Sequence, residues 1–315
     1  MFYGACHVGI GVFNMEASLA FYRNILGLKV LHDFSGEDKT MNEVIGRPAE
    51  MRVVMLGAIV GGACIKLVQF LPGKYAHKAL PVPTNRRWGD VEYCELCFDV
   101  WNAETTHNLF VKKGAKPVME VTKFSALQPD GKELISAYAY LKDPDGALVE
   151  FNNHWLDRKE VRGVDKSFDG IIRLDHLGFG VTNMDRSKAF YQDVLGFNKV
   201  IYDIEGESAM SKLVGERLNR RLVMLHNEND GAVIELIQPY PPYKARPLSP
   251  EARWGDLGVM EMGISVKDIE KHYGTLVKEK VQLIGPVGIV KELGAEHVYI
   301  KDPDGLLIEL IELPT

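Results

Sequence analysis

The hydrophobic and polar positions of residues 140–150, YLKDPDGALVE, repeat almost unchanged in residues 299–309, YIKDPDGLLIE. In both stretches apolar residues flank a DPDG sequence. Proline presets φ in a turn and glycine accepts the left-handed conformation, so the pattern predicts two strands joined by a tight turn. Each second strand carries a glutamate between apolar neighbours, Glu150 and Glu309. A buried carboxylate costs several kcal/mol or more unless a cation or hydrogen-bond donors meet it, so we expect a cation near both.

A longer repeat divides the chain into two similar halves. Residues 6–27, CHVGIGVFNMEASLAFYRNILG, match residues 175–196, DHLGFGVTNMDRSKAFYQDVLG. Shorter segments also recur, namely GACIKLVQ at 62–69 with GAVIELIQ at 231–238, and RWGD at 87–90 and again at 253–256. The long repeat predicts, in each half, an apolar strand followed by a helix with an asparagine near its N-cap and a glycine at its end.

Each half divides again into two units of one pattern, in which a strand and a helix precede about three strands. The units span residues 5–71, 91–153, 173–239 and 257–313. We therefore predict an α+β fold of four βαβββ units in two similar domains, an N-terminal domain of residues 1–156 and a C-terminal domain of residues 173–315. Residues 157–172 are charged and loop-like, and we place the linker there.

Composition and charge exclude several classes of protein. The chain has 315 residues, 46% of them hydrophobic, which predicts a sizeable core. Its net charge is −6. No basic stripe is present, so we expect no nucleic-acid partner. No apolar run approaches the roughly 18 residues of a membrane span, and no signal peptide is apparent. Cys94 and Cys97 form a C-x-x-C, but residues three apart on a strand face opposite sides, which favours buried free thiols and hence a cytoplasmic protein.

The two openings, which share a histidine, an AFY triplet and a closing LG, and the two DPDG endings resemble the vicinal oxygen chelate superfamily. This superfamily includes glyoxalase I, bleomycin-resistance proteins and extradiol dioxygenases. The resemblance covers nearly the whole chain outside the linker. It implies that paired βαβββ units form two cup-shaped domains, and that such a cup holds one divalent metal to which two substrate oxygens bind.

The resemblance also implies which positions bind the metal, because relatives take ligands from the first and last strands of paired units. In the C-terminal half these positions are His176, Glu235, Glu261 and Glu309. Many relatives carry histidine at the position of Glu261. A ligand set so rich in oxygen suits manganese, magnesium, iron or cobalt, and zinc is also compatible with it.

The N-terminal half offers His7, Glu95 and Glu150 at the matching positions, with Lys66 at the fourth. We favour the interpretation that a protonated Lys66 forms ion pairs with Glu95 and Glu150 and replaces the metal, which makes this half a structural partner with a degenerate site. The alternative is a second metal site of three ligands in which Lys66 is a base of lowered pKa.

The pairing of the units stays open at the level of sequence. Relatives pair either neighbouring units, or the first with the fourth and the second with the third. The crossed arrangement would group His176 and Glu235 with Glu95 and Glu150, and would leave a second group of His7, Lys66, Glu261 and Glu309. His176 and Glu235 stay together in both arrangements because they belong to one unit.

For the chemistry, we put metal-assisted proton transfer on a small oxygenated substrate first, as in an isomerase, epimerase or lyase. Glu235 and Glu309 are the candidate bases, since glyoxalase-like relatives use carboxylates at these positions. His297 is a candidate base or substrate donor, because it lies two residues before Tyr299 and so on the same strand face.

Two alternatives remain. The first is extradiol ring cleavage on Fe(II), which Tyr299 favours because ring-cleaving relatives carry a catalytic tyrosine there. Against it, Glu261 stands where a second histidine is needed, and Glu235 would fill a position that oxygen needs. The second is non-catalytic binding of a small molecule. We expect a small-molecule substrate and a monomer or homodimer.

Overall fold

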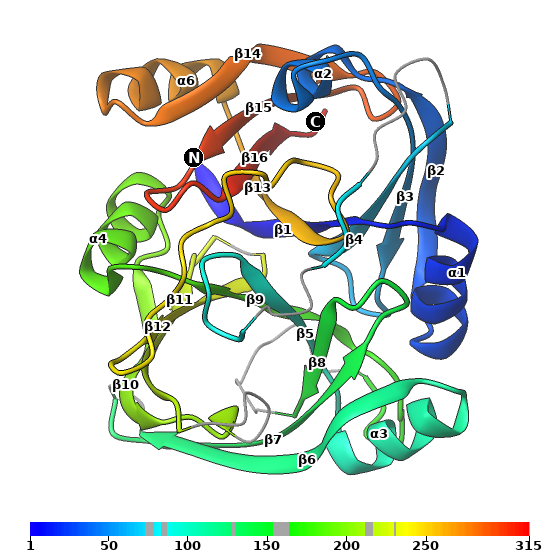
Figure 1. Cartoon of the computed structure of the whole chain (residues 1–315), viewed down its shortest axis with the longest axis vertical. Coiled ribbons are helices and arrows are strands. Elements are labelled where there is room, and N and C mark those ends of the chain that lie inside the picture. Colours follow the sequence, from blue (N-terminus) through cyan, green and yellow to red (C-terminus); the bar gives the residue numbers. More distant parts are fainter. Residues whose placement is uncertain are drawn as a thin grey trace.

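Each of the two sheets of the protein takes strands from both halves of the sequence. The computed structural model describes residues 1–72, 79–82, 87–127, 130–153, 164–211, 217–229 and 231–314. One eight-stranded sheet, which we call cup A, has the order β14-β15-β16-β13-β1-β4-β3-β2. The other, cup B, has the order β10-β11-β12-β9-β5-β8-β7-β6. Figure 1 shows cup A above cup B, with the helices at the periphery.

Cup A is built from the first and fourth units. The first unit contributes β1 (Phe2–Gly11), α1 (Met15–Leu19), the π-helical turn η1 (Ala20–Ile25), β2 (Lys29–Glu37), α2 (Lys39–Ile45), β3 (Glu50–Gly57) and β4 (Cys64–Phe70). The fourth contributes β13 (Gly258–Val266), α6 (Ile269–Lys278), β14 (Gln282–Val290), β15 (Ala295–Lys301) and β16 (Leu307–Glu312). The two units meet where β1 pairs antiparallel with β13.

Cup B is built in the same way from the second and third units. The second contributes β5 (Tyr93–Asp99), α3 (Ala103–Lys112), β6 (Lys116–Leu127), β7 (Glu133–Lys142) and β8 (Leu148–Asn152). The third contributes β9 (Arg173–Gly180), α4 (Met184–Ala189), η3 (Phe190–Val194), β10 (Lys199–Glu207), β11 (Asn219–His226) and β12 (Val233–Pro239). Here β5 pairs antiparallel with β9.

The α+β fold of four βαβββ units in two cups is therefore confirmed, and the pairing is the crossed one. This corrects the expectation that each half of the chain forms its own cup. The physical reason is that all four units share one strand pattern, so the pattern does not determine which first strands meet. Of the expected linker, residues 157–163 lie outside the described residues.

Helices α1 and α4 form where the repeat predicts them, and they join the two cups. The side chains of Asn14 and Asn183 cap their N-termini by accepting from the backbone N–H groups of Ala17 and Arg186. The chain that follows α1 places Tyr22 of the cup A unit against the DPDG turn of cup B. The matching tyrosine after α4, Tyr191, reaches the DPDG turn of cup A.

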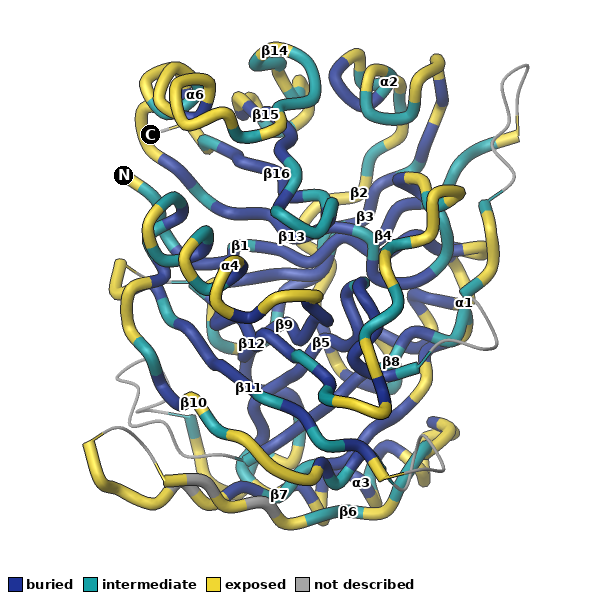
Figure 2. Tube along the Cα trace, turned by 60° about the vertical axis from the view of Figure 1, so that its left-hand side comes forward, coloured by how far each residue is buried: buried dark blue, intermediate teal, exposed yellow. Residues whose placement is uncertain are grey.

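The aspartates that begin these turns are among the points of contact. Tyr22 Oη donates to Asp143 Oδ2, and Tyr191 Oη donates to Asp302 Oδ2, both at 3.0 Å. The turn motif thus closes a hairpin and also fastens one cup to the other. Most of the central strands are buried while helices and loop ends are exposed, as Figure 2 shows. None of the helices in the described segments has the length and apolar character that a membrane span requires.

Candidate metal centre and its counterpart

The candidate ligands of cup B lie on its four central strands. Glu95 on β5 and Glu235 on β12 both pair with Gly178 of β9, one on each side. A side chain at Gly178 would collide with Glu95, because a Cβ there would lie 2.6 Å from Glu95 Oε1. The missing side chain at position 178 therefore leaves room for the carboxylates in the middle of the sheet.

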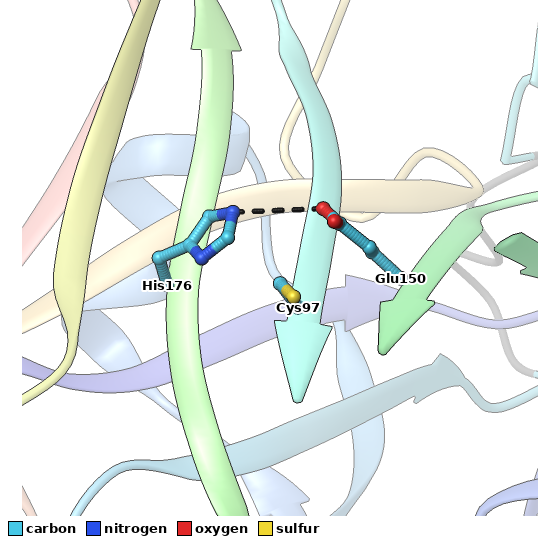
Figure 3. Close-up of side chains that lie close together, drawn as sticks. All are labelled: Cys97, Glu150 and His176. Carbon is cyan, nitrogen blue, oxygen red and sulfur yellow. Dashed lines mark ion pairs between the residues drawn. The ribbon is translucent and has the colours of Figure 1, made fainter. Parts of the chain in front are cut away.

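His176, two residues before Gly178 on β9, is the point where the candidate ligands converge. Ligand atoms of Glu95, His176 and Glu235 all lie within 4.8 Å of one another, and so do those of Cys97, Glu150 and His176. Figure 3 shows this second group, in which His176 Nε2 lies 3.6 Å from Glu150 Oε2. Cys97 Sγ already accepts a hydrogen bond from Asn152 Nδ2 at 2.9 Å. The carboxylates and the imidazole are the better ligands.

Each glutamate of cup B is held by one aromatic donor. Trp88 Nε1 donates to Glu95 Oε2 at 2.8 Å, and Tyr140 Oη donates to Glu150 Oε2 at 3.1 Å. Tyr202 Oη donates to Glu235 Oε1. Outer partners of this kind orient metal-binding carboxylates.

The remaining ligand atoms lie close to one another in the middle of the cluster. His176 Nδ1 is bound to Asp175 Oδ2 at 2.8 Å, which leaves its Nε2 turned toward the carboxylates. Glu95 Oε1 is buried and has no hydrogen-bond partner among the described residues. The residues of cup B therefore fit a divalent ion.

The charges of cup B also favour a bound cation. Burial, together with the neighbouring Glu150 and Glu235, raises the pKa of Glu95 to about 8. Burial also raises the pKa of Glu235. Among the described residues, no lysine or arginine forms an ion pair with any of these three carboxylates. Like charges gathered in an apolar sheet take up protons when no cation is present, and this is what the raised pKa values express.

In cup A, the ammonium group of Lys66 lies between the two carboxylates. Its Nζ is 2.7 Å from Glu261 Oε1 and 2.6 Å from Glu309 Oε2. His7 Nε2 lies 3.0 Å from Glu309 Oε2 on the other side. Burial alone would raise the pKa of Glu309, but Lys66, His297 and His7 hold it well below its usual value. Both carboxylates of cup A are therefore ionised and paired.

The structure divides the expected C-terminal ligand set between the two cups. His176 and Glu235 lie with Glu95 and Glu150 in cup B, whereas Glu261 and Glu309 lie with His7 and Lys66 in cup A. The expected pairing of Lys66 with Glu95 and Glu150 is wrong, because Lys66 pairs with Glu261 and Glu309. The candidate catalytic residues Tyr299 and His297 lie beside Lys66 in cup A, with Tyr299 Oη 3.4 Å from Lys66 Nζ and 2.8 Å from Glu261 Oε2.

Sequence reasoning missed the aromatic donors of cup B, although the repeats carry a signal for two of them. Trp88 precedes Glu95 by seven residues, and Trp254 precedes its own hydrogen-bond partner Glu261 by the same interval. Tyr140 precedes Glu150 by ten residues, as Tyr299 precedes Glu309. No comparable signal marks Tyr202, because the matching region of the first unit has no tyrosine.

A sequence model of the Glyoxalase/Bleomycin resistance protein/Dioxygenase superfamily matches residues 4–151 and 173–310. The protein belongs to this superfamily, as the repeats predict. The Escherichia coli (strain K12) protein YaeR, described as uncharacterized, is 29% identical over 144 residues, which cover 45% of this chain and 98% of YaeR.

Two solved structures share the four-unit architecture. Glyoxalase I from Zea mays is 16% identical, with a TM-score of 0.61, over 98% of this chain and 92% of that chain. A putative dioxygenase from Bacillus subtilis subsp. subtilis str. 168 is 14% identical, with a TM-score of 0.63, over 100% of this chain and 86% of that chain. At these identities, the likeness shows the fold.

Proposed function

We propose that cup B is the active site of a divalent-metal-dependent enzyme that moves a proton on a small oxygenated organic substrate. Such a reaction is an isomerisation, an epimerisation or a lyase reaction. One contrast carries the proposal. Three buried glutamates and an imidazole converge in cup B without an ion pair from any described lysine or arginine, whereas Lys66 fills the matching place in cup A.

The ligands would be His176 and the three glutamates, Glu95, Glu150 and Glu235. This oxygen-rich set suits manganese, magnesium, iron or cobalt better than a thiolate-seeking metal, and zinc is compatible with it. The ion would supply Lewis acidity to two neighbouring substrate oxygens and so make an adjacent C–H bond more acidic.

Glu235 is our candidate for the base that takes this proton. It lines the cavity of cup B, and burial raises its pKa. A carboxylate with a raised pKa holds a proton more readily at neutral pH. Tyr202 donates to Glu235 Oε1 and fixes the direction of the carboxylate. Glu95 and Glu150, each held by its own aromatic donor, would remain as ligands throughout.

The cavity above these residues would hold the substrate. Its empty space is about 1440 Å³, part of which is open to solvent. Tyr138 and Arg220 line it, and Arg220 Nε is buried without a hydrogen-bond partner among the described residues. We assign Arg220 to binding a substrate oxygen, because a guanidinium donates to carboxylate or carbonyl groups in a fixed geometry.

Fe(II)-dependent ring cleavage is the second candidate, favoured by the hydrogen bond from Tyr140 to Glu150 at the edge of the site. Among the described residues, the candidate ligands of cup B include one imidazole, that of His176, which argues against it, because such iron sites use two histidines and one carboxylate. If the protein carries no metal, the remaining alternative is a binding protein for small molecules.

The test follows proton exchange directly. Metal-loaded protein is incubated in D₂O with a panel of α-hydroxyketones and α-hydroxyaldehydes, and deuterium incorporation at the carbon between the oxygens is followed by NMR. We expect incorporation by the wild type and its loss in Glu235→Gln, with Glu309→Gln as the matched control in cup A. Oxygen consumption with catechols, without proton exchange, would instead support ring cleavage.

A further inference from the structure

Cup A contains a cavity of its own, which differs in character from that of cup B. Its empty space is about 610 Å³, part of which is open to solvent. The walls are apolar and flexible, and they are formed by Met41, Met51, Met55, Phe34, Val53 and Trp254. Thioether side chains adapt to irregular ligands and contact aromatic rings favourably. Cavities with apolar walls and a few polar groups are the usual binding sites of small molecules.

The inner end of this cavity is already neutral in charge. Three cationic side chains, those of Lys66, His7 and His297, lie against the carboxylates of Glu261, Glu309 and Asp38. The ammonium group of Lys66 also has its three donors engaged, by the two glutamates and by Tyr299 Oη. Among the described residues, the inner end of cup A therefore offers neither an excess negative charge for a metal ion nor a free cation for an anionic ligand.

One buried donor at this end has its nearest acceptor beyond hydrogen-bond length. His297 lines the cavity, is 1% exposed, and its Nδ1 is bound to Glu309 Oε1 at 2.6 Å. Its Nε2 has no hydrogen-bond partner among the described residues. The carboxylate oxygen of Asp38 lies 3.6 Å away, beyond hydrogen-bond length. Because a buried donor that makes no hydrogen bond of normal length is unfavourable, an acceptor supplied by a ligand would be stabilising here.

The mouth of the cavity restricts the charge of that ligand. Its polar lining there includes Glu37 and Glu292, and none of the described lining residues is an arginine. Two acidic groups repel anions. A carboxylate or phosphate ligand is thus disfavoured both at the entrance and at the inner end.

We propose that cup A is a second, metal-independent binding site for a small neutral molecule that is mainly apolar and carries one carbonyl-type acceptor. The apolar part contacts the methionines and Trp254, and the carbonyl oxygen accepts from His297 Nε2. This site does not depend on the chemistry proposed for cup B.

The test uses ¹³C-methyl labelling of methionine, because Met41, Met51 and Met55 line cup A while Met210 and Met224 line cup B. The probe is 4-phenyl-2-butanone. Its matched control is 3-phenylpropionate, which has the same skeleton with a carboxylate in place of the methyl ketone. We expect the ketone to shift the three methyl signals of cup A, with or without EDTA, and the carboxylate to leave them unchanged.

Two variants make the test specific. Val53→Phe fills cup A and should abolish the ketone-induced shifts, whereas Leu222→Phe at the matching position of cup B should not. His297→Phe should weaken ketone binding about tenfold or more, the value of one hydrogen bond from a charged donor. If His297→Phe does not fold, the comparison of Val53→Phe with Leu222→Phe still tests the proposal. Shifts at Met210 and Met224 instead, equal binding of the carboxylate, or no shift at millimolar ketone would overturn the proposal.

Discussion

Lys66 and Glu235 occupy the same place in the two cups. Lys66 pairs with Gly9 of β1, and Glu235 pairs with Gly178 of β9, in parallel registers that match residue for residue. A cation and an anion thus stand at equivalent points of two otherwise similar carboxylate clusters. The difference between the cups follows from this exchange: cup A carries its own cation, and we propose that cup B takes one from outside.

The first prediction exchanges the two side chains. Lys66→Glu gives cup A the ligand set of cup B, so metal content measured by elemental analysis should rise from one to two ions per chain. Without metal this variant should be destabilised by about 3–5 kcal/mol, because removing one partner leaves buried charges unpaired. The reciprocal Glu235→Lys should fold without metal and contain none. A Lys66→Glu protein that still binds one ion would contradict the prediction.

The second prediction concerns the tyrosines that orient the ligands. Tyr140→Phe removes the donor to Glu150 and should lower metal affinity about 10–100-fold, the usual effect of losing such a partner. Tyr202→Phe should act similarly through Glu235. Tyr299→Phe is the matched control, since Tyr299 holds the position of Tyr140 in cup A. Competition titration with a fluorescent chelator measures all three, and an equal loss in Tyr299→Phe would refute the assignment.

The third prediction concerns Gly178 and Gly9, the two glycines against which Glu95 and Glu261 pack. Gly178→Ala places a methyl group against Glu95, so it should displace that ligand and reduce metal affinity. Gly9→Ala meets the Glu261 side chain in the same way and should lower stability without reducing metal affinity. Chemical denaturation and metal titration of both variants separate the two effects. The prediction fails if Gly9→Ala is the variant that loses metal.

The fourth prediction is a pH dependence at the contacts between the cups. Burial raises the pKa of Asp143, and that of Asp302, from 3.8 to about 6. The folded state then binds the proton more tightly than the unfolded state. Each carboxyl therefore contributes stability that is full below about pH 4 and is lost as the pH rises to about 6.

Replacing the carboxyl by an amide removes this dependence. Between pH 4 and pH 7, Asp143→Asn should gain up to about 3 kcal/mol in unfolding free energy relative to the wild type, from the size of the pKa shift. Urea denaturation at the two pH values measures it. Asp165→Asn, at an exposed turn, is the control and should show no such gain. A constant difference between wild type and Asp143→Asn would rule out the linkage.

The repeats predicted much of this molecule because local signals repeat wherever local structure repeats. The caps at Asn14 and Asn183 and the two DPDG hairpins are determined by residues close in sequence. The meeting of β1 with β13 is not, because β1 has the same pattern as β9 and would suit either partner. For the same reason, the sequence predicted which residue types and which strands carry the candidate ligands. It did not predict which of these residues meet in the same cup.

His297 and Tyr299 show the consequence for function. They lie on the predicted strand and face the predicted carboxylate, Glu309, yet that carboxylate is paired with Lys66. Which cluster contains Lys66 depends on contacts between strands that are far apart in the sequence, such as those of Lys66 with Glu261 and Glu309. Sequence periodicity carries no information on such contacts.

The most direct measurement is the metal content of Glu95→Ala beside Glu261→Ala, two glutamates that each lie seven residues after a tryptophan that binds them. After loading with Mn²⁺, desalting and elemental analysis, we expect one ion per chain in the wild type and in Glu261→Ala, and none in Glu95→Ala. Metal retained in Glu95→Ala and lost in Glu261→Ala would place the metal centre in cup A and contradict its assignment to cup B.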